Sequence, residues 1–143
     1  MIQTILVGVD GTEGSRRALV WAAGRAQELG AEVVAVLAIR PFGEFVSDVP
    51  PLPGDVVHRL RKRLETTWCA PLRDAGVRYR SIAVEDDPSQ ALVSIADRER
   101  ADMIVLGARG HGRMLDRLLG SVTYKVAHRA HCPVVIVPSG DAP

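Results

Sequence analysis

The sequence predicts an α/β fold, an open sandwich in which a parallel sheet of five strands carries helices on both faces. Two observations support this prediction. Short apolar runs alternate with longer segments of helical periodicity, a pattern typical of parallel strands joined by helices. Three of the short runs are continuously apolar, as expected for strands buried on both sides. In such sheets ligands bind beyond the carboxyl ends of the strands, where the strand order reverses.

Five strands and four helices follow from this alternation. In chain order they are a strand at 4–9, a helix at 15–30, a strand at 32–39, a proline-rich loop at 40–55, a helix at 56–76, a strand at 79–85, a helix at 87–100, a strand at 103–107, a helix at 121–130 and a strand at 133–138. Asp10-Gly11 forms the turn after the first strand, and Gly30 ends the first helix. One face of that helix is apolar, through Leu19, Ala22, Ala23, Ala26 and Leu29.

Later elements carry their own signals. Pro71 lacks an N–H group and is expected to kink or restart the second helix. The strand at 79–85 is less apolar than the others, which indicates a position near a sheet edge. Asp87 suits the N-cap of the third helix, and Pro88 suits its first helical position.

The length of 143 residues indicates one domain over residues 1–143, with 139–143 as a frayed tail. The net charge of +1 favours neither nucleic acid nor an anionic membrane as a partner. No apolar run approaches the roughly 18 residues that a membrane span needs, and the N-terminus lacks a basic leader. Cys69 and Cys132 have no metal-binding spacing. We therefore expect a cytoplasmic protein with reduced cysteines.

The stretch "GARGHGRMLDRLLGS" (107–121) bears most directly on function. It joins the end of the fourth strand to the start of the last helix. A helix N-terminus offers unpaired N–H groups that suit phosphate, and glycine lets a backbone approach an anion closely. Arg109, His111 and Arg113 add cationic partners, and Ser121 adds a hydroxyl that can also cap the helix. From the residues alone, a phosphate cradle and a surface loop both remain open.

Two better-known phosphate motifs are excluded. A Walker A loop needs a lysine before its serine, and Gly120 holds that place. The glycines at 107, 110 and 112 lack the G-x-G-x-x-G spacing of a dinucleotide fingerprint, and they follow the fourth strand rather than the first.

The spacing of Gly107, Gly110, Gly120 and Ser121 resembles the G-x2-G-x9-G-[ST] signature of the universal stress protein family. The segments at 5–19, 101–110 and 118–138 are similar to the family's opening and C-terminal half, so the resemblance covers nearly the whole chain. It implies a Rossmann-like sandwich with strand order 3-2-1-4-5. One departure is Asp86, where the family often has glycine before Asp-Pro.

The resemblance also implies a site for ATP with Mg²⁺. Gly8 and Val9 would lie under the adenine, and the Ala38 backbone would pair with its edge. Asp10 would lie near the ribose and the metal-bearing phosphates, as the one protein ligand expected for the metal. The backbone at 107–110 would follow the ribose and phosphates. The full predicted set is Gly8, Val9, Asp10, Ala38, Gly107, Arg109, Gly110, Gly112, Arg113, Gly120, Ser121 and Val122.

Several functions remain open. The resemblance favours an ATP-binding stress-response regulator over a cyclic AMP binder, a weak ATP hydrolase or a ligand-free interaction module. No nucleophile–base pair or paired carboxylates indicate a dedicated enzyme. The last strand is apolar and lies at a sheet edge in the implied order, a position that natural proteins pair or cover. We therefore expect a homodimer through Val134, Val135, Ile136 and Val137.

Overall fold

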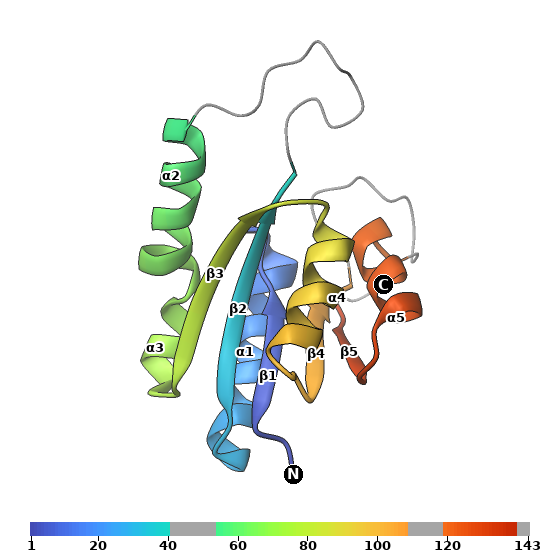
Figure 1. Cartoon of the computed structure of the whole chain (residues 1–143). Coiled ribbons are helices and arrows are strands. Elements are labelled where there is room, and N and C mark those ends of the chain that lie inside the picture. The colour runs from blue at the N-terminus through green and yellow to red at the C-terminus, as the bar shows by residue number, and fades with distance from the viewer. Residues whose placement is uncertain (41–53, 109–118, 140–143) are drawn as a thin grey trace.

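The computed structural model describes residues 1–40, 54–108 and 119–139, and it confirms the predicted α/β architecture (Figure 1). All strand pairs are parallel, and the sheet order is β3-β2-β1-β4-β5. The strands are β1 (Thr4–Gly8), β2 (Glu32–Ile39), β3 (Tyr79–Glu85), β4 (Met103–Gly107) and β5 (Val134–Val137). The order reverses between β1 and β4, whose carboxyl ends therefore lie side by side.

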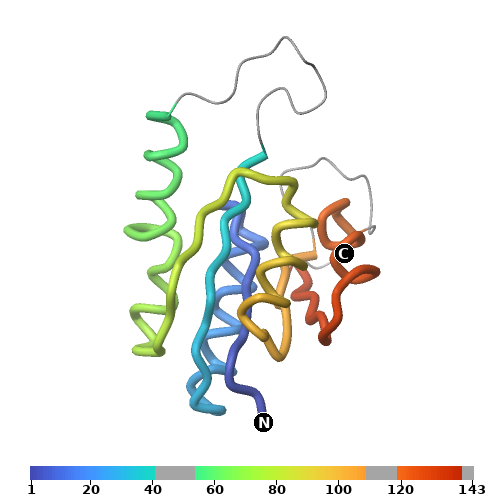
Figure 2. The backbone as a smooth tube through the Cα atoms, in the orientation of Figure 1, coloured from blue at the N-terminus to red at the C-terminus, as the bar shows by residue number. Residues whose placement is uncertain are grey.

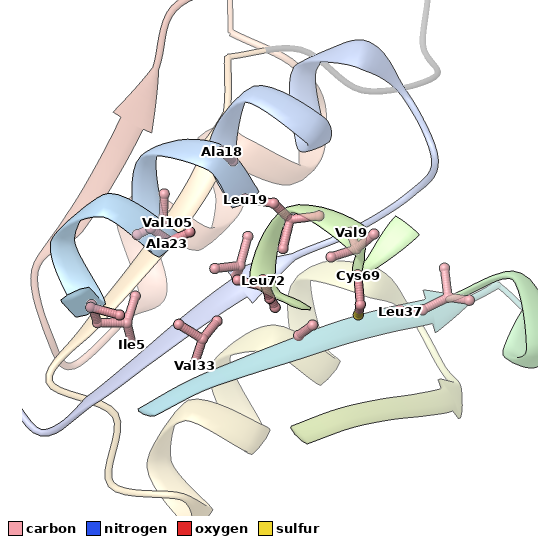
Figure 3. Close-up of a cluster of buried hydrophobic side chains, with 14 of the residues drawn as sticks. Ile5, Val9, Ala18, Leu19, Ala23, Val33, Leu37, Cys69, Leu72 and Val105 are labelled. Atoms are coloured by element: carbon pink, nitrogen blue, oxygen red, sulfur yellow. The ribbon is translucent and has the colours of Figure 1, made fainter. Parts of the chain in front are cut away.

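Helices cover both faces of this sheet (Figure 2). They are α1 (Glu13–Leu29), α2 (Gly54–Arg63), the π-helical turn η1 (Leu64–Trp68), α3 (Ala70–Ala75), α4 (Pro88–Arg98) and α5 (Ser121–Arg129). Side chains alternate along each strand, so Ile5 and Val7 pack under α1 and α3 while Leu6 packs under α4 and α5. Figure 3 shows the first of these two clusters, between the sheet and α1 and α3.

Local signals position the first helix. The Thr12 hydroxyl caps α1 by accepting from the Ser15 N–H at 3.3 Å, and Gly30 ends the helix with φ of 67°. The cap places the start at Glu13, two residues before the predicted one. The prediction that Leu29 belongs to the buried face is wrong, because it is 45% exposed. It lies about 80° around the helix from Leu19, at the margin of the apolar stripe.

The predicted signals for α4 are confirmed. Asp87 is its N-cap, accepting from the Gln90 N–H at 3.1 Å, and Pro88 is its first residue. The expected edge position of β3 is also confirmed. The proline-rich loop lies outside the described residues between 41 and 53, as does the tail after 139. None of the helices in the described parts of the chain is both long and apolar enough to span a membrane.

The predicted break at Pro71 occurs as a π turn followed by a new helix. The Cys69 N–H bonds to the Leu64 carbonyl, five residues back, at 3.1 Å. Pro71 lies in the first turn of α3, where its missing N–H costs nothing. The Arg73 guanidinium donates to the carbonyl oxygens of Glu65 at 2.6 Å and Thr66 at 2.7 Å, groups that the π turn leaves without their usual helical donors.

Both described cysteines are free thiols. Cys69, between η1 and α3, is fully buried, and burial raises the pKa of its thiol to about 11. The thiolate is therefore scarce at neutral pH, which suits a packing role rather than a reactive one.

The start of β1 depends on one carboxylate. Asp102 accepts hydrogen bonds from the backbone N–H groups of Gln3 at 2.7 Å and Thr4 at 3.0 Å, and these bonds hold its pKa below the ordinary value of 3.8. A depressed pKa contributes stability above the unfolded-state value, and that stability is lost as pH falls through the folded-state value. We expect Asp102→Ala to destabilise the fold at pH 7 and to flatten its loss of stability below about pH 4. Urea denaturation between pH 7 and pH 3 measures both effects, and a variant that parallels the wild type over this range contradicts them.

Candidate functional site

A cleft of about 420 Å³ opens at the carboxyl ends of β1, β2 and β4, where the strand order reverses. Its volume lies within the usual range for small-molecule sites. The described residues that line it are Gly8, Val9, Asp10, Thr12, Ser15, Val36, Ala38, Arg40, Pro88, Leu92, Leu106, Gly107, Gly120, Ser121, Val122 and Thr123. The cleft therefore joins the β1–α1 loop, the start of α4 and the start of α5.

The N-terminus of α5 forms one end of the cleft. Gly120 is the N-cap, and its N–H bonds to the Ala108 carbonyl at 2.8 Å. Helix geometry leaves the next three N–H groups, of Ser121, Val122 and Thr123, without acceptors in the helix. The Thr123 hydroxyl donates to the Gly107 carbonyl at 2.9 Å and ties α5 to the end of β4. The arrangement is suited to an anion.

The suggestion that Ser121 caps this helix is wrong. Gly120 holds the N-cap position, and Ser121 is the first helical residue and exposed. A serine with helical backbone angles no longer reaches the N–H groups that a cap would satisfy.

A compact hydrogen-bond network holds Asp10. Its Oδ1 atom accepts from the Thr12 N–H at 3.0 Å and from the Thr12 hydroxyl. The Asp10 N–H bonds to Ser15 Oγ at 3.3 Å, and Ser15 Oγ donates to the Thr12 carbonyl at 3.0 Å. The carboxylate is therefore oriented by the same residue that caps α1.

Two predicted glycines lie at close contacts in the packing, against backbone for Gly107 and against leucine side chains for Gly8. A Cβ atom on Gly107 would lie 2.7 Å from the backbone carbon and oxygen of Gly14, in the first turn of α1. A Cβ on Gly8 would lie 2.6 Å from Leu106 Cδ2 and 3.3 Å from Leu92 Cδ1. Glycine at these positions lets β4 approach α1 and lets α4 approach β1, and this brings the walls of the cleft together.

The opposite part of the cleft is apolar, with Arg40 at its border. The apolar lining comes from Val36, Ala38, Pro88, Leu92 and Leu106. Arg40 Nη1 pairs with Asp87 Oδ1 at 3.0 Å. Partial burial raises the pKa of Asp87, but hydrogen bonds from Ser89 and Gln90 and the charge of Arg40 outweigh it and lower the pKa. Asp87 therefore stays ionised, as an N-cap and as the partner of Arg40.

The predicted site residues that the structure describes all line this one cleft: Gly8, Val9, Asp10, Ala38, Gly107, Gly120, Ser121 and Val122. The others, Arg109, Gly110, Gly112 and Arg113, lie outside the described residues. The lining residues that the sequence interpretation missed are Thr12, Ser15, Val36, Arg40, Pro88, Leu92, Leu106 and Thr123. Thr12 had a readable signal, since a threonine followed by an acidic residue after a turn favours a helix start.

The described residues contain no cluster of three or more His, Cys, Asp or Glu side chains that could hold a metal ion. Asp10 is the one carboxylate among the described lining residues. A magnesium ion here would need most of its oxygen ligands from a bound phosphate and from water, which is a common arrangement for that ion.

Comparison with known proteins shows which family the chain belongs to. The model of the universal stress protein family matches residues 1–138. The chain belongs to the universal stress protein family. A universal stress protein of Thermus aquaticus is 33% identical to it over 96% of this chain and 99% of its own length. The universal stress protein MJ0531 of Methanocaldococcus jannaschii is 30% identical over 96% of this chain and 82% of its own.

Solved structures share the fold of this chain. A universal stress protein in complex with cAMP is 28% identical, with a TM-score of 0.73 over 97% of this chain and 98% of its own. The hypothetical protein MJ0577 has a TM-score of 0.80 at 25% identity over 99% of both chains. The strand order of this chain, 3-2-1-4-5, is therefore that of a Rossmann-like member of this family.

Proposed function

We propose that the cleft binds ATP with Mg²⁺ and that the protein is a nucleotide-dependent regulator of a stress response. One observation carries the proposal: the N-terminus of α5, the Asp10 carboxylate and an apolar slot line a single cleft at the switch point of the sheet. Each part suits a different part of a nucleotide. The G-x2-G-x9-G-S spacing and membership of the family support the assignment.

The phosphates lie at the start of α5. The N–H groups of Ser121 and Val122 and the dipole of the helix stabilise their charge, and Gly120 leaves room for them. Arg109, Gly110, Gly112 and Arg113, which lie outside the described residues, complete the proposed set of nucleotide contacts. When bound, Mg²⁺ neutralises phosphate charge.

The base and the metal take the other parts of the cleft. Gly8, Val9 and Ala38 surround the adenine in the apolar slot, where Ala38 offers its backbone to the edge of the ring. Among the described lining residues, Asp10 is the carboxylate that would hold the magnesium ion. Its network with Thr12 fixes the carboxylate before the nucleotide arrives.

Cyclic AMP is the second candidate ligand. The structure of a universal stress protein in complex with cAMP, 28% identical to this chain, favours it. Both ligands share adenine, ribose and a phosphate, so the slot and the helix N-terminus suit each of them. They differ in that only ATP brings a triphosphate chain that can hold Mg²⁺ beside Asp10.

Ligand identification tests the proposal. We expect mass spectrometry of small molecules released from the purified protein to show ATP, and calorimetry to show tighter binding of ATP with Mg²⁺ than of cAMP. Tighter binding of cAMP, with no dependence on Mg²⁺, contradicts the ATP assignment. Binding of neither nucleotide contradicts the proposed function as a whole.

A regulator needs no rapid hydrolysis, and Asp10 is the one candidate base among the described lining residues. We expect phosphate release from ATP to stay close to that of a variant carrying Asp10→Ala and Ser121→Ala. Release well above that background supports a hydrolase instead.

The β5 edge is proposed as the dimer contact. All four of its residues, Val134, Val135, Ile136 and Val137, are half-buried in the single chain. Ile136 is the one of them that packs against neither buried cluster. We expect light scattering at micromolar concentration to give a dimer mass, and Ile136→Lys to give a folded monomer. A monomeric wild type contradicts this contact.

A further inference from the structure

The β1–α1 loop separates two cavities. The cleft lies on one side, and a groove of about 680 Å³ between α1 and the η1–α3 segment lies on the other. Thr12 and Ser15 line both cavities, while Gly11 and Trp68 line the groove. The β1–α1 loop and the first turn of α1 therefore form the wall between the two cavities. A group that supports this loop from the groove also determines where Asp10 lies in the cleft.

Trp68 provides such a support. Gly11 has φ of 80°, and a Cβ atom there would lie 2.5 Å from Trp68 Cζ2 and 2.9 Å from Trp68 Cε2. The six-membered ring of the indole thus occupies the place where any other residue would carry its side chain. Any other residue at position 11 would force the loop or the indole to move.

The π turn and two arginines hold this indole in position. Trp68 is the last residue of the π turn, and the Arg73 guanidinium donates to the Glu65 and Thr66 carbonyls of that turn. The Arg63 guanidinium lies over the ring, 5.4 Å from its centroid. Single π-helical turns occur frequently at functional sites.

We propose that Trp68 is a positioning residue of the nucleotide site. It supports Gly11 and so fixes Thr12, whose N–H and hydroxyl orient the Asp10 carboxylate toward the metal-bearing phosphates. The inference rests on the proposed function, since it requires that Asp10 contact Mg²⁺ bound with ATP. It adds a residue that lies outside the lining of the cleft.

Trp68→Leu tests this role, with Trp21→Leu as the matched control. Trp21 packs against the same buried cluster and has its own arginine, Arg25, 5.6 Å from the ring centroid. By calorimetry we expect Trp68→Leu to weaken binding of ATP with Mg²⁺ by about tenfold, as loss of an outer support of a metal ligand typically does. In EDTA, the affinity of Trp68→Leu for ATP should fall by less than about threefold. The affinity of Trp21→Leu should fall by less than about twofold in either condition.

The outcomes separate the two proposals. If the wild type binds no ATP, the proposed function fails. If the wild type binds ATP with Mg²⁺ but Trp68→Leu has the same affinity as Trp21→Leu, the positioning role is overturned. It is also overturned if Trp68→Leu loses the same factor in ATP affinity with and without Mg²⁺. Partial recovery of affinity by Trp68→Phe, which keeps an aromatic ring at this position, supports it.

A second measurement needs no destabilising substitution at Trp68. The chain has two tryptophans, so Trp21→Phe leaves Trp68 as the single one. We expect its fluorescence emission to shift when ATP and Mg²⁺ are added and to shift less with ATP in EDTA. If the emission shift is the same with and without Mg²⁺ while calorimetry records binding of ATP with Mg²⁺, the inference is overturned.

Discussion

Gly120→Val is expected to abolish binding of ATP while the protein remains folded. Gly120 is the buried N-cap of α5 and lines the cleft where the phosphates are proposed to lie. Valine adds three carbons at that point and excludes a phosphate from the unpaired N–H groups. We expect affinity to fall by roughly a hundredfold or more, which corresponds to about 2.8 kcal/mol.

The backbone predicts that this variant folds. Gly120 has φ of −59° and ψ of 156°, a conformation that valine adopts without strain. The expected cost in stability is about 1 kcal/mol, because valine is a poorer N-cap than glycine. Calorimetry with ATP and thermal denaturation measure the two effects. Unchanged affinity in the folded variant means that the start of α5 does not hold the phosphates.

Gly107→Ala is expected to have the largest effect on stability. The added Cβ would lie 2.7 Å from the carbonyl carbon and oxygen of Gly14, and both are backbone atoms that no rotamer change can move. Helix α1 must shift away from β4, at a cost of about 3 kcal/mol. For a chain of this size that loss lowers Tm by roughly 10 °C.

Gly24→Ala is the control for both substitutions. Gly24 lies in the middle of α1, and a Cβ there meets nothing within 4 Å. We expect this variant to be more stable than the wild type by about 0.5–1 kcal/mol, because alanine favours the helix. Nucleotide binding should not change. If the Tm of Gly107→Ala equals or exceeds that of Gly24→Ala, the close approach of β4 to α1 tolerates a methyl group.

The fold was readable from the sequence because its signals are local. Apolar runs marked the strands, and Asp87 with Pro88 marked the start of α4. Pro71 marked the break before α3, since its missing N–H acts on the chain within one turn. The strand order came instead from the resemblance carried by the spacing of Gly107, Gly110, Gly120 and Ser121, because periodicity alone does not order the strands of a sheet.

The site was readable only in part, because much of it depends on contacts between distant segments. Gly107 was interpreted through its backbone alone, while its lack of a side chain also serves packing against Gly14. The role of Trp68 could not be predicted from the sequence, because its place beneath Gly11 depends on the π turn. Arg40 gave no signal, since its partner Asp87 is distant in sequence.

The central claim is that a nucleotide phosphate lies at the start of α5, and amide chemical shifts in solution test it most directly. In ¹H–¹⁵N spectra of the wild type, addition of ATP with Mg²⁺ should shift the N–H signals of Ser121, Val122 and Thr123 strongly. Those of Gly24 and its neighbours on α1 should stay in place. Binding of ATP that leaves the three α5 signals unmoved would contradict the account.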